Sequence, residues 1–255
     1  MIEAIPDPLR LLIALGLTML VVLLRLEAER FGAAEYAEPD DAGQRSLVRR
    51  LTWYAIGAAL IVGVLLFHPD PAGDLYLGAG ARGSTILMGM LYGIAAAMQA
   101  VVYSRYRYGR VRLPDVGAYP GALLNQIGTA FLDEAAFRGA LLGFLVFAGL
   151  NPLLAVVVQA LIYALSTRLG APGRDLYMFA LALGAGFLGG WVTIATGGFA
   201  AAFIGHAVMR ISVFLVTGHA GHPAPRGREA EEIERRRRPP EGWRVIPTRV
   251  TTRDR

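Results

Sequence analysis

The sequence predicts an all-α polytopic membrane protein with about seven transmembrane helices, arranged as a helical bundle. The first observation is composition: of 255 residues, 55% are hydrophobic and only 18% are charged. That balance excludes a disordered chain, a collagen-like rod and an ordinary soluble domain. The second observation is a series of long apolar stretches, and the third is an alternation of arginine-rich and arginine-poor loops between them.

The apolar stretches have the length and pattern of membrane-spanning helices. A bilayer core about 30 Å thick needs roughly 20 apolar residues in a helix. The stretches are apolar throughout and do not alternate with polar residues, which favours helices over strands. The expected spans are Leu9–Leu24, Leu51–Phe67, Ser84–Tyr103, Leu123–Ala148, Pro152–Ser166, Leu176–Ile194 and Phe199–Val216.

The loops predict the orientation. The chain has no lysine, and its loop arginines are concentrated in every second loop and in the carboxyl-terminal tail, with Arg82 alone in the second loop. Under the positive-inside rule this pattern places the amino end outside and the carboxyl end in the cytoplasm of a multi-pass cell-membrane protein. No small-residue cleavage site follows the first span, so we expect an uncleaved anchor.

The chain divides into three expected parts. Residues 1–120 hold three spans with polar loops, residues 121–217 hold a four-helix functional bundle, and residues 218–255 form an arginine-rich cytoplasmic tail. The run Arg235–Arg238 in the tail could attract anionic lipids. Neighbouring glutamates cancel most of its charge, so we expect a solvated, disordered tail. The arginines follow loops and not one folded face, so nucleic acid is not an expected partner.

Five ionisable residues lie inside expected spans, where each costs roughly 2.5–3.5 kcal/mol and therefore marks function by default. They are Asp133, Glu134, Arg138, His206 and Arg210. At about 1.5 Å per residue, Glu134 lies about 16 Å and His206 about 15 Å from the cytoplasmic ends of their spans. The alternative is purely structural: Glu134 and Arg138 would form a neutralised pair that holds helices together, and His206 would be a packing residue. The matched depth on two spans favours a functional site.

The expected fourth span carries a recognisable motif. It reads Asp133-Glu134-x-x-x-Arg138-Gly139, which closely resembles the Glu-Glu-x-x-x-Arg motif of the CAAX prenyl endopeptidase and bacteriocin-processing family (CPBP, also called Abi). These proteins are intramembrane proteases of the glutamate type.

Two further segments follow in the family's order. Gln159–Thr167 is similar to the segment with the family's Phe-x-x-x-His motif, with Tyr163 at the Phe position and Thr167 at the His position. His206-x-x-x-Arg210 is similar to its His-x-x-x-Asn motif. The resemblance covers roughly residues 122–216.

The resemblance implies an intramembrane endopeptidase in which Glu134 is the general base for a water, held by Arg138 and flanked by Asp133. His206 and Arg210 would stabilise the oxyanion, and Tyr163 and Thr167 would contact substrate. No metal or cofactor is implied. The partners would be the lipid bilayer and a membrane protein or lipidated peptide as substrate.

Two other functions remain open. A relative that binds substrates without cutting them could serve as a membrane scaffold, since threonine replaces the second-motif histidine at position 167. A small transporter could use Glu134, Arg138 and His206 as a proton relay, although the sequence shows no repeat symmetry. A zincin-type metal site is not indicated, because the sequence contains no His-Glu-x-x-His.

Overall fold

The computed structural model describes residues 5–28, 30–31, 43–108, 112–114, 120–169, 176–217 and 243–245. The helices are α1 (Asp7–Leu24), α2 (Gly43–Phe67), α3 (Pro71–Asp74), α4 (Arg82–Tyr108), α5 (Pro120–Glu134), α6 (Leu142–Phe147), α7 (Pro152–Leu169), α8 (Leu176–Thr196) and α9 (Ala200–Thr217). A 3-10 turn, Arg25–Glu27, follows α1, and a π-helical segment, Ala135–Leu141, joins α5 to α6. Strands β1 (Arg112–Pro114) and β2 (Trp243–Val245) pair antiparallel.

The helical membrane bundle that the sequence predicts is confirmed. Among the described residues, five helices are long and apolar enough to cross a membrane, and they match the first, second, third, fifth and sixth expected spans. The seventh expected span is the shorter apolar helix α9. The fourth is the composite of α5, the π-helical segment and α6, which together run from Pro120 to Phe147.

The boundaries differ from expectation mainly where helices continue past the apolar stretches. Helix α2 begins at Gly43, inside the segment expected as a polar loop, and α7 continues to Leu169, three residues beyond Ser166. The loop expected between His68 and Arg82 contains the short helix α3, whose amino end is capped by the Asp70 side chain at 3.0 Å from the Gly73 nitrogen. Within the tail the structure describes only β2, so the expected disorder concerns residues outside the described ones.

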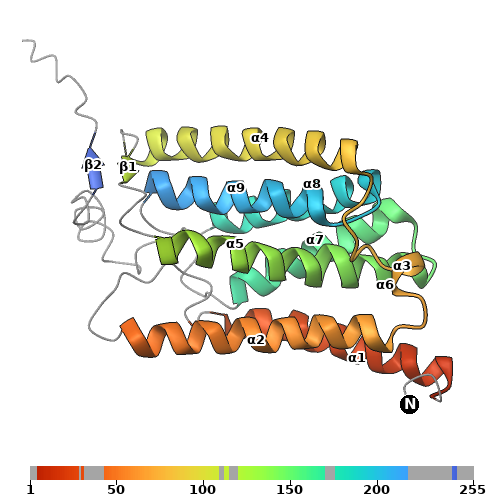
Figure 1. The fold of residues 1–255 in the computed structure, drawn as a ribbon. Coiled ribbons are helices and arrows are strands. Elements are labelled where there is room, and N and C mark those ends of the chain that lie inside the picture. The colour runs from red at the N-terminus through yellow and green to blue at the C-terminus, as the bar shows by residue number, and fades with distance from the viewer. Residues whose placement is uncertain are drawn as a thin grey trace, which may run out of the picture.

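The helices lie roughly parallel in layers (Figure 1). Helix α4 packs along α9, α7 packs along α8, and α1 pairs with α2, while α5 lies between these groups and contacts α9. The amino terminus lies at one end of the bundle. The arginine-rich connections begin at the opposite end, where β1 and the carboxyl end of α9 are found (Figure 1).

Polarity is distributed as expected for a protein surrounded by lipid. Large apolar side chains cover the outside, including Leu12, Leu87 and Val102, which are 64%, 59% and 66% exposed. Charged and amide side chains are instead buried between the helices. In hydrocarbon the outer surface must be apolar, and every backbone polar group must be paired within the protein. The exposed apolar side chains of this bundle meet the first condition. The hydrogen bonds within its helices meet most of the second.

The π-helical segment is tied to the far end of the bundle. The Tyr76 nitrogen donates to the Gly139 carbonyl at 3.1 Å, and the Tyr76 carbonyl accepts from the Phe199 nitrogen at 3.0 Å. The loop before α4 thereby joins the π-helical segment to the start of α9. Short π-helical segments within α-helices are often found at functional sites, because they change the direction of the side chains that follow.

Candidate functional site

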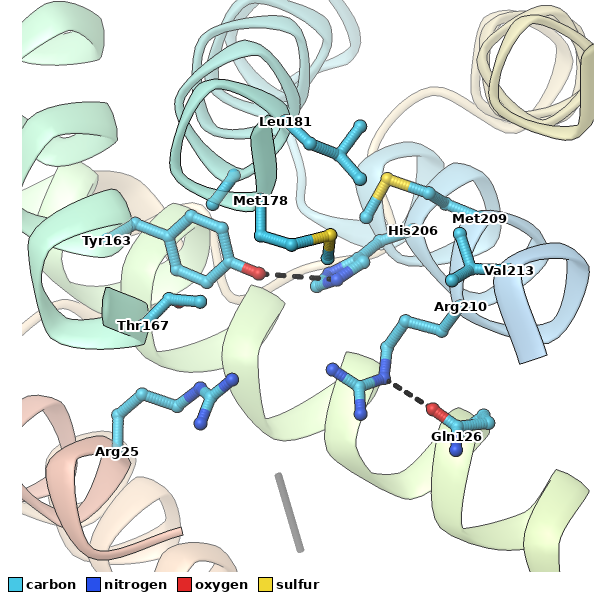
Figure 2. Close-up of a pocket in the computed structure, with 11 residues that line it drawn as sticks. Arg25, Gln126, Tyr163, Thr167, Met178, Leu181, His206, Met209, Arg210 and Val213 are labelled. Carbon is cyan, nitrogen blue, oxygen red and sulfur yellow. Dashed lines mark hydrogen bonds between the residues drawn. The ribbon is translucent and has the colours of Figure 1, made fainter. Parts of the chain in front are cut away.

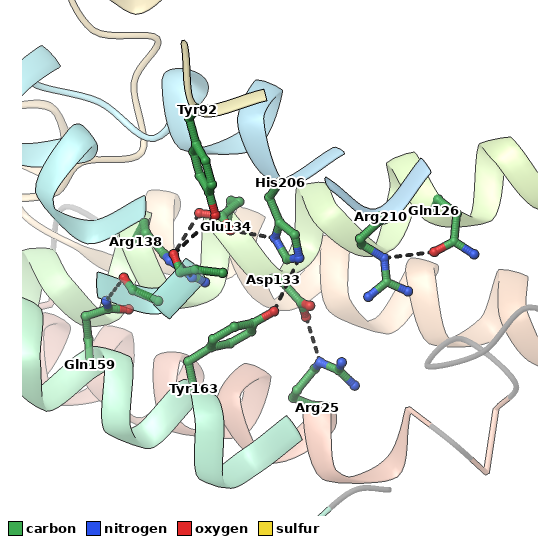
Figure 3. Close-up of polar contacts among 12 residues, drawn as sticks. Arg25, Tyr92, Gln126, Asp133, Glu134, Arg138, Gln159, Tyr163, His206 and Arg210 are labelled. Atoms are coloured by element: carbon green, nitrogen blue, oxygen red, sulfur yellow. Dashed lines mark hydrogen bonds and ion pairs between the residues drawn. The ribbon is translucent and has the colours of Figure 1, made fainter. Parts of the chain in front are cut away.

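Glu134 lies at the centre of a buried charged cluster. Its Oε1 atom is 2.6 Å from Nδ1 of His206 on α9, and its Oε2 atom is 3.2 Å from Nε of Arg138. All three side chains are at most 1% exposed. Figure 3 shows the carboxylate between the guanidinium and the imidazole. The depth match predicted from the topology therefore corresponds to direct contact between the two helices.

The surrounding backbone fixes this cluster. Glu134 is the last residue of α5, and Arg138 lies in the π-helical segment, where it also donates to the Ala185 carbonyl at 3.2 Å. Gly189 on α8 leaves the room for this pair, because a Cβ atom there would lie 3.1 Å from Nε of Arg138 and 3.4 Å from Oε2 of Glu134. Close approach between α8 and the charged pair thus depends on a glycine.

The imidazole connects the cluster to Tyr163 on α7. The Tyr163 hydroxyl lies 3.3 Å from Nε2 of His206, and its ring lies 4.2 Å from the Arg138 guanidinium carbon. A carboxylate can only accept, so the Nδ1 atom of His206 carries the hydrogen that faces Glu134. In the neutral ring Nε2 is then an acceptor, and the tyrosine hydroxyl donates to it.

A second pair of contacts lies beside the first. The Asp133 Oδ1 atom is 2.9 Å from Nε of Arg25, which follows α1, and both side chains are at most 3% exposed. Arg210, one turn beyond His206 on α9, donates from Nε to the Gln126 Oε1 atom at 3.0 Å. Asp133 and Glu134 are neighbours in sequence but project in directions about 100° apart on a helix, which explains their different partners.

These residues surround a pocket of about 40 Å³, which has room for a few water molecules. The pocket has a polar part and an apolar part. Its lining residues are Arg25, Gln126, Tyr163, Thr167, Met178, Leu181, Ala182, His206, Met209, Arg210 and Val213 (Figure 2). Most of them lie near the helix ends that lead into the arginine-rich connections, so the pocket is at that end of the bundle.

The structure brings together most of the residues singled out in the sequence. His206, Arg210, Tyr163 and Thr167 all line the pocket, and Thr167 does so because α7 continues past the expected boundary. Glu134 does not line the pocket and reaches it only through His206. The Thr167 hydroxyl is buried and has no hydrogen-bond partner among the described residues.

Sequence reasoning missed the two other polar residues of the pocket, Arg25 and Gln126. Arg25 was counted only as a loop arginine, and Gln126 is a lone amide in an apolar span. The single available signal for Arg25 was its place directly after an apolar stretch, which does not reveal its partner. Within the described part of the chain, no group of three or more His, Asp or Glu side chains has the arrangement of a metal site.

Comparison with known proteins identifies the part of the chain that contains this cluster. Residues 115–212 match the family model described as type II CAAX prenyl endopeptidase Rce1-like. The comparisons with curated proteins and with solved structures found no match. The matched segment contains Glu134, His206 and Tyr163 but not Arg25. The match of residues 115–212 to this family model confirms the resemblance drawn from the three motifs.

Proposed function

We propose that the protein is an intramembrane endopeptidase that uses Glu134 and His206 to activate a water against a peptide bond of a membrane-associated substrate. The observation that carries the proposal is the 2.6 Å contact between the buried carboxylate and the imidazole, whose other nitrogen faces a pocket with room for water. A general base must lie within hydrogen-bond reach of the proton it removes. Here the atom within reach of a water in the pocket is Nε2 of His206.

The carboxylate acts through the imidazole. Glu134 accepts the Nδ1 hydrogen and holds the ring in the tautomer whose Nε2 atom is free to take a proton. A water in the pocket gives its proton to Nε2 while its oxygen attacks the carbonyl carbon. The imidazolium that forms is stabilised by the neighbouring carboxylate. On collapse of the tetrahedral intermediate, Nε2 returns the proton to the leaving nitrogen and the carbon–nitrogen bond breaks.

In this proposal two donors bind the oxyanion. The Arg210 Nη2 atom has no hydrogen-bond partner among the described residues, and its side chain lines the pocket. The Tyr163 hydroxyl is the second donor, because its 3.3 Å hydrogen bond to Nε2 is long and can be exchanged for one to substrate when water takes that position. A preorganised charged donor such as Arg210 is worth about a hundred- to thousandfold in rate. The neutral Tyr163 hydroxyl contributes less, up to about tenfold.

The substrate would reach this pocket from the cytoplasmic side. The pocket lies at the arginine-rich end of the bundle, which the positive-inside rule assigns to the cytoplasm of a cell-membrane protein. A membrane protein or a lipidated peptide could present a bond there without leaving the bilayer.

Cleavage of membrane peptides by the purified full-length chain tests the proposal. The chain would be reconstituted in liposomes with a library of internally quenched membrane peptides, and the products would be identified by mass spectrometry. We expect Glu134→Gln and His206→Gln to lower the rate at least about a hundredfold. Asp74→Asn, which makes the same chemical change in the loop at the opposite end, is the matched control and should cleave normally. Cleavage that survives Glu134→Gln, or no cleavage of any peptide, would count against the proposal.

One observation favours a second candidate, a relative that binds without cutting. Thr167 stands where the family motif has histidine, and a hydroxyl does not exchange protons near neutral pH as an imidazole does. That candidate predicts that library peptides bind the chain, yet none is cleaved under any condition. The same liposome experiment, with bound peptide measured beside cleaved peptide, separates the two.

A further inference from the structure

A tyrosine outside the segment that matches the family model reaches the cluster of Glu134, Arg138 and His206. Tyr92 lies on α4, is 7% exposed, and extends toward Glu134 and Arg138 (Figure 3). Its hydroxyl donates to the Ala185 carbonyl of α8 at 3.3 Å, and Nη2 of Arg138 donates to the same carbonyl at 3.2 Å. The phenol and the guanidinium are therefore bound to one backbone acceptor.

Close packing of α4 against α9 brings Tyr92 into this position. A Cβ atom on Gly205 of α9 would overlap the Tyr92 ring. On α4, a Cβ atom on Gly89 or Gly93 would lie 3.0 or 3.2 Å, respectively, from a side chain of α9. Gly205 directly precedes His206 in the chain. The Tyr92 ring therefore packs against the backbone that carries the imidazole, while its hydroxyl reaches the carbonyl that accepts from the guanidinium.

The position of the Glu134 carboxylate depends on that guanidinium. Oε2 of Glu134 and Nε of Arg138 are 3.2 Å apart, yet both atoms are buried and neither has a hydrogen-bond partner among the described residues. The two groups are thus joined by charge and not by a directed hydrogen bond. A carboxylate held in this way moves with its counter-charge, so a group that fixes Arg138 also fixes the carboxylate that faces His206.

Packing alone does not require a hydroxyl on the Tyr92 ring. A phenylalanine would fill the same space, and a hydroxyl taken out of water is costly unless its hydrogen bond compensates for the loss. The 3.3 Å bond of Tyr92 is long and shares its acceptor with a cation, so its contribution to stability is small. The clearer effect of this bond is to fix the carbonyl to which Arg138 binds.

We infer that Tyr92 is a positioning residue for the cleavage reaction: it fixes Arg138 and the backbone beside His206. The 2.6 Å contact between Glu134 and the imidazole is kept in this way. This inference rests on the proposed function. Tyr92 does not line the pocket, so it acts through the cluster and not on the substrate. Loss of its hydroxyl should therefore lower kcat and leave KM unchanged.

The Nδ1 proton of His206 reports this position without any cleavage. The full-length chain in nanodiscs, with isotope-labelled histidine, should show a far-downfield proton resonance from the short bond to Glu134, and His206→Gln identifies that resonance by its loss. Tyr92→Phe keeps the ring and removes the hydroxyl. We expect the resonance to shift upfield and its exchange with water to become up to about tenfold faster, because one neutral hydrogen bond is worth at most about that factor in an equilibrium.

Tyr54→Phe is the matched control. It removes a hydroxyl that lies 2.6 Å from Oδ1 of Asn125 and 2.9 Å from Oγ1 of Thr129, between α2 and α5, so it should cost at least as much stability as Tyr92→Phe. The melting temperature measures that cost. The His206 resonance should nevertheless keep its position in Tyr54→Phe, and peptide cleavage in liposomes should keep its kcat. In Tyr92→Phe, kcat should fall up to about tenfold at constant KM.

The outcomes separate positioning from packing and from substrate contact. A resonance that stays in place in Tyr92→Phe would overturn the inference. An equal shift in Tyr54→Phe would also overturn it, because the shift would then be a general consequence of lost stability. A higher KM with unchanged kcat in Tyr92→Phe would place the hydroxyl on the substrate and would likewise overturn it. A shift confined to Tyr92→Phe, in a chain that cleaves no peptide, would sustain the positioning of Glu134 and His206 and reject only the peptidase.

Discussion

The two acidic neighbours Asp133 and Glu134 belong to two charged clusters with different properties. Glu134 lies among Arg138 and His206, in a cluster whose side chains are at most 1% exposed and whose Glu–Arg pair is balanced in charge. Asp133 lies beside Arg25, next to Arg210, in a cluster that borders the pocket and has an excess positive charge. Two adjacent carboxylates on α5 thus lie in surroundings that differ in net charge and in access to the pocket.

The difference between the two clusters suggests different roles: chemistry for the cluster of Glu134 and binding for the cluster of Asp133. A buried ion pair with a hydrogen bond to the imidazole can hold a carboxylate and an imidazole in one geometry, which general base catalysis requires. A cluster with unused donors on a pocket can accept an external group. The first lies wholly within the segment that matches the family model, whereas the second includes Arg25 from the turn that follows α1. We therefore expect the chemistry to depend on the family motif and the selectivity to depend on the contact with α1.

The largest expected effect is on stability, from breaking the closed cluster. Glu134→Met would leave the Arg138 charge buried without its carboxylate, at a cost of about 3–5 kcal/mol. The double variant Glu134→Met with Arg138→Met should recover most of that loss, because it removes both charges together. The apparent melting temperature in detergent, followed by tryptophan fluorescence, measures both. If the double variant were as unstable as the single one, the pair would not be the source of the effect.

The first cluster could be predicted from sequence because its signals are local. The apolar stretches fixed the depth of Glu134 and His206 independently, and the spacing of Glu134 and Arg138 placed them on one face, as found at 3.2 Å. The partner of Asp133 could not be predicted, because it depends on where α1 packs in three dimensions. The π-helical segment was also unexpected, since no residue type in Ala135–Leu141 distinguishes it from an ordinary apolar helix.

A smaller loss of stability is expected from the pocket-facing pair. Asp133→Asn leaves Arg25 without its carboxylate, but water in the pocket can solvate the freed guanidinium. We expect a cost of about 1–3 kcal/mol, below that of Glu134→Met in the same melting experiment. Equal costs at the two positions would show that the second cluster is as closed as the first, and would remove the distinction between them.

Helix α8 offers a matched pair of glycines to sharpen the comparison. A Cβ atom at Gly189 would press on Arg138 and Glu134, whereas at Gly184 it would meet nothing within 4 Å. Gly189→Ala should therefore displace the Glu134 carboxylate slightly and lower the cleavage rate about tenfold, while Gly184→Ala should leave it unchanged. Both substitutions replace glycine by alanine within α8 and raise its helix propensity equally. Their effect on the melting temperature through helix propensity therefore cancels when the two variants are compared. Identical cleavage rates in the two variants would contradict the role assigned to Gly189.

Removal of one hydroxyl tests the contact between Tyr163 and the cluster of Glu134, Arg138 and His206. Tyr163→Phe deletes the 3.3 Å contact to His206 and keeps the ring against Arg138. We expect up to about a tenfold fall in cleavage rate, because a neutral hydrogen bond of this kind contributes about 0.5–1.5 kcal/mol. The melting temperature should barely change, and it is the control for folding. A large drop in melting temperature with an unaltered rate would make Tyr163 a packing residue only.

The smallest effect concerns His68, at the end of the bundle away from both clusters. Burial lowers the pKa of His68 below its usual value, partly opposed by Asp74 and Asp70, and its Nδ1 atom accepts from the Asp70 nitrogen at 3.2 Å. A histidine with a lowered pKa in the folded chain stabilises the fold above about pH 6.5, and that contribution is lost as the pH falls toward the folded-state pKa. The wild-type melting temperature should thus fall between pH 7.5 and about 5.5 more than that of His68→Gln. Because that loss is confined to the far end, the cleavage rate of the folded protein should depend on pH in the same way in the two proteins. A pH dependence that shifts with His68→Gln would mean that the two ends of the bundle are coupled.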